Sequence, residues 1–297
     1  MIWLIGNKGM LGSDIERLLK EQGFAYCASD REIDITDYKT LEKFGKDKKI
    51  RWVINCAGYT KVDKAEEEID EAFRINKDGV RNIALFSSKR QIKLIHISTD
   101  YVFDGLQKAA FAYSEDDETN PINIYGKSKL AGEQEIKEVL EKYFIIRTAW
   151  LYGLQGNNFV YTMLKLFKEK EVVKVVKDQW GTPTYTIDLA KGILKIIKDN
   201  SVSYGLYHFT NEGVANWYEF ALTIYKKAKR LELIEGNKKV EIQPIKTEDY
   251  PTAAKRPRYS VLSKEKIEKK FNLKIRDWDK ALEDFLVSLK ENKIENI

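Results

Sequence analysis

Short apolar runs alternate with segments of helical periodicity through the first half of the chain. The apolar runs predict buried strands, and apolar residues that recur every three or four positions predict helices that pack by one face. The expected strands cover residues 2–5, 24–28, 52–57, 94–98 and 144–148, and the expected helices cover residues 11–22, 41–48, 69–90 and 128–140. Strands that alternate with helices indicate an α/β fold, with a Rossmann-type doubly wound parallel sheet between two helical layers.

The pattern becomes less regular after Trp150. A further strand is expected at residues 172–176, further helices are expected at residues 186–197, 216–229 and 277–289, and an irregular stretch containing Pro and Arg covers residues 244–260. We therefore expect a first domain at residues 1–150, to which parts of about residues 172–205 return. Residues 151–297 would form mainly a smaller α/β lobe.

The composition suits a water-soluble protein and argues against several other classes. Of 297 residues, 43% are hydrophobic and 33% are charged, which allows a sizeable core under a polar surface. The net charge is only +5 and the basic residues are spread along the chain, so we expect no nucleic-acid-binding surface. No apolar stretch approaches the roughly 18 residues of a membrane helix, and no secretory signal is expected. The two cysteines, Cys27 and Cys56, indicate free thiols and a cytoplasmic protein.

Three glycines follow the first expected strand at a spacing typical of dinucleotide-binding turns. Gly6, Gly9 and Gly12 form a G-x-x-G-x-x-G pattern that leads directly into the first expected helix. Glycines at these points allow a tight turn, a close approach of the backbone to a pyrophosphate, and close packing of helix on strand. Met10 and Leu11 lie in the first helical turn, where free N–H groups attract anions. The pattern favours a binding domain for NADPH or NADH over a purely structural turn.

Charged residues after the second expected strand bear on the choice of cofactor. Asp30 lies about 20 residues beyond the turn, where an acidic side chain binds a ribose hydroxyl. The adjacent Arg31 is suited to a 2′-phosphate, but it could equally be a solvated surface charge, so NADH and NADPH both remain open. Asp34 and Ile35 are expected beside the adenine.

Small residues end the third expected strand. Cys56, Ala57 and Gly58 would let the backbone approach the cofactor, and tight packing of strand on helix is the alternative.

A tyrosine and a lysine four residues apart suggest a catalytic pair. Tyr125 and Lys129 would share one face of a helix. An ammonium beside a phenol lowers the pKa of the phenol, which can then give a proton to a carbonyl oxygen as hydride reaches the carbon. Ser98, Thr99 and Asp100 lie at the C-terminal end of the fourth expected strand, the sheet edge where ligands bind. Thr99 or Ser98 would contact the carbonyl oxygen, and Asp100 would contact substrate hydroxyls. The alternatives are a surface Tyr/Lys pair and a hydroxyl cap at a strand end.

The two histidines, His96 and His208, lie in strand-like contexts. We interpret each as a packed core residue rather than as a catalyst or a metal ligand. No metal cluster emerges from the spacing of the possible ligands, so we expect no metal.

On these motifs the chain resembles the extended short-chain dehydrogenase/reductases, and within them the dTDP-4-dehydrorhamnose reductases. The resemblance runs essentially end to end. Its markers are residues 6–12, 55–66, 98–105, 125–129, 147–150, 156–159, 178–184 and 255–257. The markers in the second half separate this family from sugar epimerases and dehydratases. Cys56 and Gly58 stand where the family often has alanine, and Trp180 stands where it often has phenylalanine or histidine.

The resemblance implies NAD(P)H-dependent reduction of the 4-keto group of dTDP-4-dehydro-L-rhamnose to dTDP-L-rhamnose, a precursor of surface polysaccharide. Tyr125 would donate the proton, Lys129 would bind the nicotinamide ribose and tune Tyr125, and Thr99 would be the third catalytic residue. The substrate-binding residues would be Thr99, Asp100, Tyr125, Trp150, Asn158 and Arg256.

Two other functions are compatible with these motifs. One is a related nucleotide-sugar epimerase or reductase that acts on another sugar. The other is a non-catalytic regulatory subunit of methionine adenosyltransferase, against which the intact Thr99, Tyr125 and Lys129 argue. A nucleotide sugar is the expected small-molecule partner, with no nucleic acid and no membrane, and the chain is expected to be a monomer or a homodimer.

Overall fold

A six-stranded parallel sheet forms the centre of the larger lobe. The computed structural model describes residues 1–106 and 111–292. In spatial order the strands are β10 (Gly205–His208), β5 (Tyr143–Thr148), β4 (Lys93–Thr99), β3 (Trp52–Asn55), β1 (Ile2–Ile5) and β2 (Tyr26–Ser29). All of their pairings are parallel, and Trp3 of β1 lies between Cys27 and Val53. The strand order reverses between β1 and β3, and ligands of open α/β sheets bind in the crevice at such a point.

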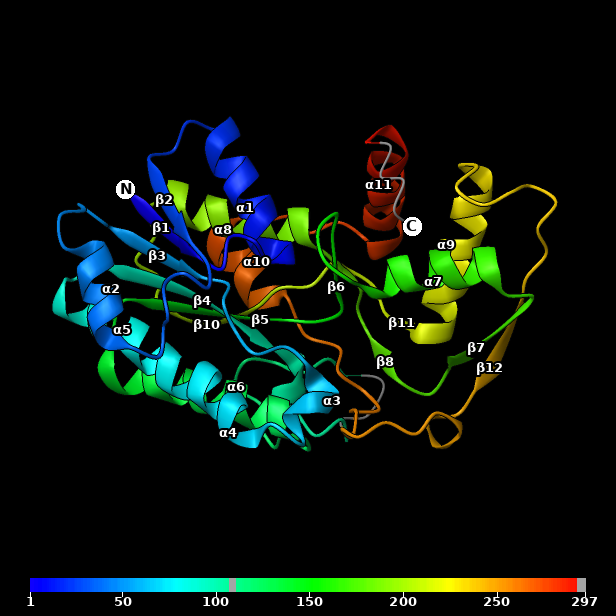
Figure 1. Ribbon diagram of the computed structural model, residues 1–297, viewed down its shortest axis with the longest axis horizontal. Helices are drawn as coiled ribbons and strands as arrows, with labels where there is room; N and C mark the ends of the chain where they lie inside the picture. The colour runs from blue at the N-terminus through cyan, green and yellow to red at the C-terminus, as the bar shows by residue number, and fades with distance from the viewer. Residues whose placement is uncertain (107–110, 293–297) are drawn as a thin grey trace.

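Helices cover both faces of this sheet, which explains why β1 is apolar at every position and why most residues of the other central strands are buried. Ile2 and Leu4 face one buried cluster, and Trp3 and Ile5 face the other. The first cluster includes side chains from α1 (Met10–Glu21), α8 (Thr186–Lys198) and α10 (Glu265–Phe271). The second lies under α2 (Tyr38–Gly45), α5 (Val80–Lys89) and α6 (Ile124–Val139), and α3 (Val62–Ala65) and α4 (Ile69–Phe73) lie next to α6. Figure 1 shows the sheet between these two layers.

A smaller lobe stands at the side of the sheet, on the right in Figure 1. Its core is built on α7 (Phe159–Glu169), α9 (Trp217–Arg230) and α11 (Trp278–Glu291). Short strand pairs complete it: β7 (Val172–Val176) with β12 (Glu241–Ile245), β8 (Trp180–Gly181) with β11 (Ala215–Asn216), and β6 (Leu151–Tyr152) with β9 (Thr184–Tyr185). The single-turn helices at Asp100–Val102 and Thr247–Asp249 lie in connections.

The α/β fold with a parallel Rossmann-type sheet is confirmed, and several boundaries differ from the expectation. The helix expected over residues 69–90 is interrupted by a π-helical segment, Arg74–Gly79, between α4 and α5. Strand β7 pairs with β12 in the smaller lobe, whereas α8 and β10 return to the larger one. Within the described ranges, no helix is long and apolar enough to cross a membrane.

Helix α6 begins at Ile124, four residues before the expected start, and therefore carries both Tyr125 and Lys129. Asn123 causes this early start, because its side-chain oxygen accepts a hydrogen bond of 2.7 Å from the backbone N–H of Gly126.

Candidate active site

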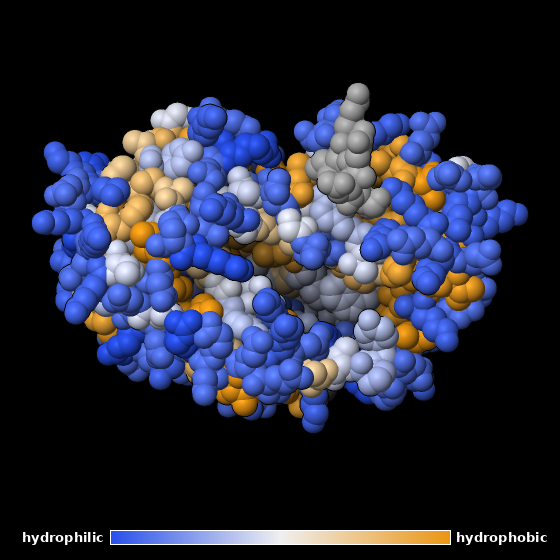
Figure 2. All heavy atoms as spheres, in the orientation of Figure 1, coloured by the Kyte–Doolittle hydropathy of each residue, from blue (hydrophilic) through white to orange (hydrophobic). Residues whose placement is uncertain are grey.

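A cleft of about 1250 Å³ runs along the carboxyl ends of the central strands and reaches the smaller lobe. Figure 2 shows the molecule hollowed between the two lobes. The predicted residues that line the cleft are Gly6, Gly9, Met10, Leu11, Gly12, Asp30, Arg31, Asp34, Ile35, Cys56, Ala57, Gly58, Thr99, Asp100, Tyr125, Lys129 and Trp150. Residues chosen from separate motifs are thus brought together in one place.

The glycine turn between β1 and α1 has no room for side chains. Gly6 has a φ of +81°, and a Cβ there would lie 2.7 Å from the backbone nitrogen of Ala57. A Cβ on Gly12 would lie 2.0 Å from the carbonyl oxygen of Gly6. Gly9 is the N-cap of α1, and no acidic residue lies in the first turn. The free N–H groups of that turn therefore face the cleft as a site for an anion.

Replacing Gly12 by alanine is expected to weaken NADPH binding at least about tenfold, because the turn must open to admit the new methyl group. Fluorescence titration of the purified variant with NADPH measures the loss. Gly236→Ala is the matched control, since a Cβ at Gly236 meets nothing within 4 Å. Equal affinities of the two variants would contradict a tight phosphate-binding turn.

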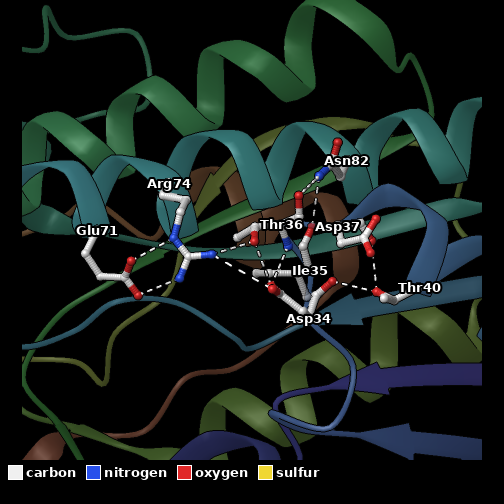
Figure 3. A network of polar contacts seen from close by, with 8 residues as sticks. All are labelled: Asp34, Ile35, Thr36, Asp37, Thr40, Glu71, Arg74 and Asn82. Carbon is white, nitrogen blue, oxygen red and sulfur yellow. Dashed lines mark hydrogen bonds and ion pairs between the residues drawn. The ribbon is translucent and has the colours of Figure 1, made fainter.

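A network of polar contacts holds the loop beyond β2 at one end of the cleft (Figure 3). Arg74 donates to both carboxylate oxygens of Glu71, over 2.7 Å each, and to the hydroxyl of Thr36 over 2.6 Å. The backbone N–H and hydroxyl of Thr36 both donate to Asp34 and hold the pKa of that carboxyl below its usual value. Asn82 donates to the carbonyl oxygens of Ile35 and Thr36.

Arg74 lines the cleft together with Arg31, and the sequence analysis missed it. No motif or spacing signals it, because it reaches the loop from the π-helical segment between α4 and α5. Two guanidinium groups and the carboxylates of Asp30 and Asp34 therefore line the end of the cleft where the adenosine of a dinucleotide is expected.

The segment after β3 is fixed by asparagine side chains. The Asn55 side-chain oxygen accepts a hydrogen bond of 3.0 Å from the Ala57 N–H. Asn76, from the π-helical segment, accepts from the Tyr59 N–H over 2.8 Å and donates to the Tyr59 carbonyl over 3.0 Å. A Cβ on Gly58 would lie 3.1 Å from Oδ1 of Asn76 and 3.6 Å from Nζ of Lys129, so this glycine packs closely beside both side chains in the cleft.

Tyr125 and Lys129 both lie in the cleft, and each has an altered pKa. Burial lowers the pKa of Lys129 to about 8, against the opposing effect of Glu133. Burial raises the pKa of Tyr125 to about 12, against the opposing hydrogen bond with Thr99. The expected lowering of the phenol pKa by Lys129 is therefore not seen, because the effect of burial on the phenol dominates. Nζ of Lys129 instead donates to the Ile97 carbonyl over 2.7 Å. Tyr125 keeps its proton at neutral pH, as a proton donor must.

Asp100 is a buried carboxylic acid beside this pair. Its side chain is 2% exposed, and burial raises its pKa to about 7. The Thr99 hydroxyl donates to Oδ1 of Asp100 over 3.1 Å. Oδ2 has no hydrogen-bond partner of normal geometry among the described residues, although the nearby Ser260 hydroxyl partly opposes the rise in pKa. A ligand hydroxyl in the cleft could satisfy this oxygen.

Two stacked tryptophans form the wall that the smaller lobe contributes. The rings of Trp150 and Trp217 lie 3.5 Å apart at an angle of 9°. Trp150 has a left-handed backbone, with φ of +46°, and a Cβ on Gly181 would lie 2.7 Å from its indole. Trp217 donates through Nε1 to Gln179 over 3.2 Å. The sequence analysis missed Trp217, which no motif links to the first half of the chain.

Asn158 and Arg256 do not line this cleft. Asn158 caps α7, where it accepts from the Tyr161 N–H and donates to the Gly153 carbonyl. Arg256 pairs with Asp63, with Nη2 2.7 Å from Oδ2. Their substrate-binding roles stay predictions that need a movement of these side chains.

His208, one of the two histidines of the chain, is buried, with Nδ1 3.2 Å from the Tyr113 carbonyl oxygen, and it does not line this cleft. Within residues 1–106 and 111–292, no three side chains of the metal-binding types gather closely enough to hold an ion.

Known proteins share the whole of this architecture. A family model described as "RmlD substrate binding domain" matches residues 1–291. A dTDP-4-dehydrorhamnose reductase of Aggregatibacter actinomycetemcomitans is 39% identical, over 95% of this chain and 96% of the relative. The crystal structure of a dTDP-4-dehydrorhamnose reductase from Clostridium acetobutylicum has a TM-score of 0.90 and 41% identity, over 97% of this chain and 99% of that chain. The enzyme of that name from Bacillus anthracis, in complex with NADP, has a TM-score of 0.89 and 41% identity, over 97% and 98% of the two chains.

Proposed function

This chain belongs to the RmlD family of dTDP-4-dehydrorhamnose reductases, and we propose that it reduces the 4-keto group of dTDP-4-dehydro-L-rhamnose to give dTDP-L-rhamnose. The main observation behind the proposal is that the glycine turn, Thr99, Tyr125 and Lys129 all line one cleft. A ketone reductase needs a hydride donor and a proton donor at the same carbonyl group, and this arrangement provides a site for both.

A nicotinamide dinucleotide fits the residues of the larger lobe. The turn at Gly6 and Gly12 excludes side chains, and the N-terminus of α1 offers N–H groups to a pyrophosphate. Asp30 suits the 2′-hydroxyl of NADH, whereas Arg31 suits the 2′-phosphate of NADPH, and Arg74 adds a second guanidinium nearby. We therefore propose that both NADPH and NADH are accepted. When bound, the reduced cofactor supplies the hydride.

The chain's own residues would supply the proton and hold the reacting groups. Tyr125 gives its phenolic proton to the carbonyl oxygen as hydride reaches C4, so that the ketone becomes a secondary alcohol. Its raised pKa keeps the phenol protonated until an alkoxide, which is a stronger base, develops. The Thr99 hydroxyl donates to Oδ1 of Asp100 in the free protein and would turn to donate to the same carbonyl oxygen once substrate is bound. The Lys129 ammonium would bind the nicotinamide ribose.

The sugar would lie between the two lobes. Oδ2 of Asp100, which lacks a partner among the described residues, would accept from a sugar hydroxyl. The stacked Trp150 and Trp217 offer an apolar wall against which a deoxysugar ring can pack.

A coupled measurement tests this function. Purified protein is mixed with NADPH or NADH and dTDP-4-dehydro-L-rhamnose, and we expect the nicotinamide absorbance to fall while NMR detects dTDP-L-rhamnose. Inversion of an existing stereocentre of the sugar without net cofactor consumption would instead indicate an epimerase. No turnover together with tight binding to methionine adenosyltransferase would overturn the proposal in favour of a regulatory subunit. The ratio of kcat/KM for the two cofactors also decides between Asp30 and Arg31 as the residue that sets the preference.

A further inference from the structure

His96 has a polar neighbour at each ring nitrogen, and one of these neighbours is Lys129 of the proposed active site. It lies on β4 and is fully buried. Its Nδ1 is 3.0 Å from Nδ2 of Asn55, on the neighbouring strand β3. Its Nε2 is 3.5 Å from Nζ of Lys129, on α6. His96 thus stands between a buried amide and a residue of the proposed active site.

The orientation of the Asn55 amide follows from its other contact. Oδ1 of Asn55 accepts the backbone N–H of Ala57 over 3.0 Å. A flipped amide would place an NH₂ group against that N–H, donor against donor. Nδ2 of Asn55 therefore faces His96 and donates to Nδ1 of the ring.

The position of the imidazole proton follows in turn. Burial, and then the charge of Lys129, lowers the pKa of His96 well below its usual value, so that the ring is neutral. A neutral imidazole carries one N–H, and Nδ1 is already an acceptor. The hydrogen must be on Nε2, and it points toward Nζ of Lys129.

The Lys129 ammonium therefore faces a hydrogen-bond donor, the Nε2–H of His96, at a position where an acceptor would stabilise its charge better. Its ammonium already donates to the Ile97 carbonyl over 2.7 Å. The other titratable groups around it are Glu133, on its own helix, and Cys56, at the end of β3, and both favour its charged form. The Nε2–H of His96 is the facing group that opposes the charge, and it leaves the remaining ammonium hydrogens to the cleft that Lys129 lines.

We propose that His96, held by Asn55, is a positioning residue that sets the direction and the proton affinity of Lys129. Nε2–H turns the free donors of the ammonium into the cleft and makes the ammonium easier to deprotonate. The effect on turnover rests on the proposed reductase function, whereas the tautomer of His96 and the ionisation of Lys129 are properties of the free protein.

The tautomer is measured on the wild-type protein by two-bond ¹H–¹⁵N correlation NMR of the imidazole rings. The chain has only two histidines, so the His208→Asn variant assigns both rings. We expect the Nε2–H form at His96. In Asn55→Asp the carboxylate accepts from Ala57 and also from the ring, so we expect the hydrogen to move to Nδ1. An Nδ1–H form in the wild-type protein would overturn the proposal.

The ionisation of Lys129 is then followed by NMR titration of its Cε resonance, assigned by its loss in Lys129→Met. His96→Asn keeps an amide near Asn55 but removes the group that faces Nζ, and we expect the pKa of Lys129 to rise by about one unit. The high-pH limb of kcat/KM, which follows loss of the ammonium, should shift upward by the same amount. His208→Asn should leave both unchanged. An unchanged Lys129 pKa in folded His96→Asn contradicts the proposal even if the protein reduces no keto-sugar.

Discussion

Tyr125→Phe is expected to lower kcat by about 10²- to 10⁴-fold, the range that a general acid contributes. The phenol is the proton donor of the proposed reaction, and burial raises its pKa to about 12, so the proton is present throughout the neutral range. Phenylalanine fills the same space without a proton to give. Steady-state kinetics with NADPH and the keto-sugar measure the loss, and NADPH titration should show an affinity within about twofold of the wild type.

Tyr207→Phe is the matched control for this variant. Tyr207 is buried in the larger lobe and donates its hydroxyl to the Ser203 carbonyl over 2.6 Å, outside the cleft. The Tyr207→Phe variant should be somewhat less stable than the wild-type protein and should have the same kcat. If Tyr125→Phe also keeps a near wild-type kcat, Tyr125 is not the general acid.

Arg147→Met is expected to destabilise the protein by about 3–5 kcal/mol, because it leaves a buried carboxylate without its partner. Nε and Nη2 of Arg147 donate to the two carboxylate oxygens of Glu133 over 2.9 and 2.7 Å, and Ser98 donates to the same carboxylate over 2.6 Å. The side chains of Arg147 and Glu133 are 2% and 0% exposed. Thermal unfolding should show a Tm lowered by about 10 °C.

Two further variants separate a buried charge from a generally fragile site. Arg147→Met combined with Glu133→Leu removes both charges and should recover most of the lost Tm, since an apolar pair often replaces a buried ion pair without cost. Lys195→Met breaks an exposed pair with Asp199 and should change the free energy of unfolding by less than about 1 kcal/mol. A double variant as unstable as Arg147→Met would show that packing, rather than charge, causes the loss.

The sequence predicted those features that depend on local pattern. Strand β1 is apolar at every position because helices cover both of its faces, and this run indicated a buried parallel strand. Gly6 and Gly12 could be recognised because the tight turn permits no side chain at either position. Tyr125 and Lys129 could be paired because a helical spacing of four residues places them on one face.

Features that depend on tertiary contacts could not be predicted in this way. Arg74 reaches Thr36 in the loop beyond β2 from a π-helical segment that has no sequence signature. Trp217 becomes part of the site only because α9 places it against Trp150. His96 is a buried residue, as predicted, but its contacts with Asn55 and Lys129 could not be predicted because these residues lie on another strand and on a helix.

The way in which the chain interleaves its two lobes has a consequence for synthesis on the ribosome. Strand β10 completes the sheet of the larger lobe, and α8 and α10 cover part of the sheet face that carries Ile2 and Leu4. All three elements follow the first segments of the smaller lobe along the chain. A nascent chain that has emerged only as far as β5 therefore exposes an unpaired strand edge and an apolar sheet face. At about 5–20 residues per second this interval lasts several seconds. The nascent larger lobe is thus a stretch of the chain that a ribosome-associated chaperone would be expected to shield.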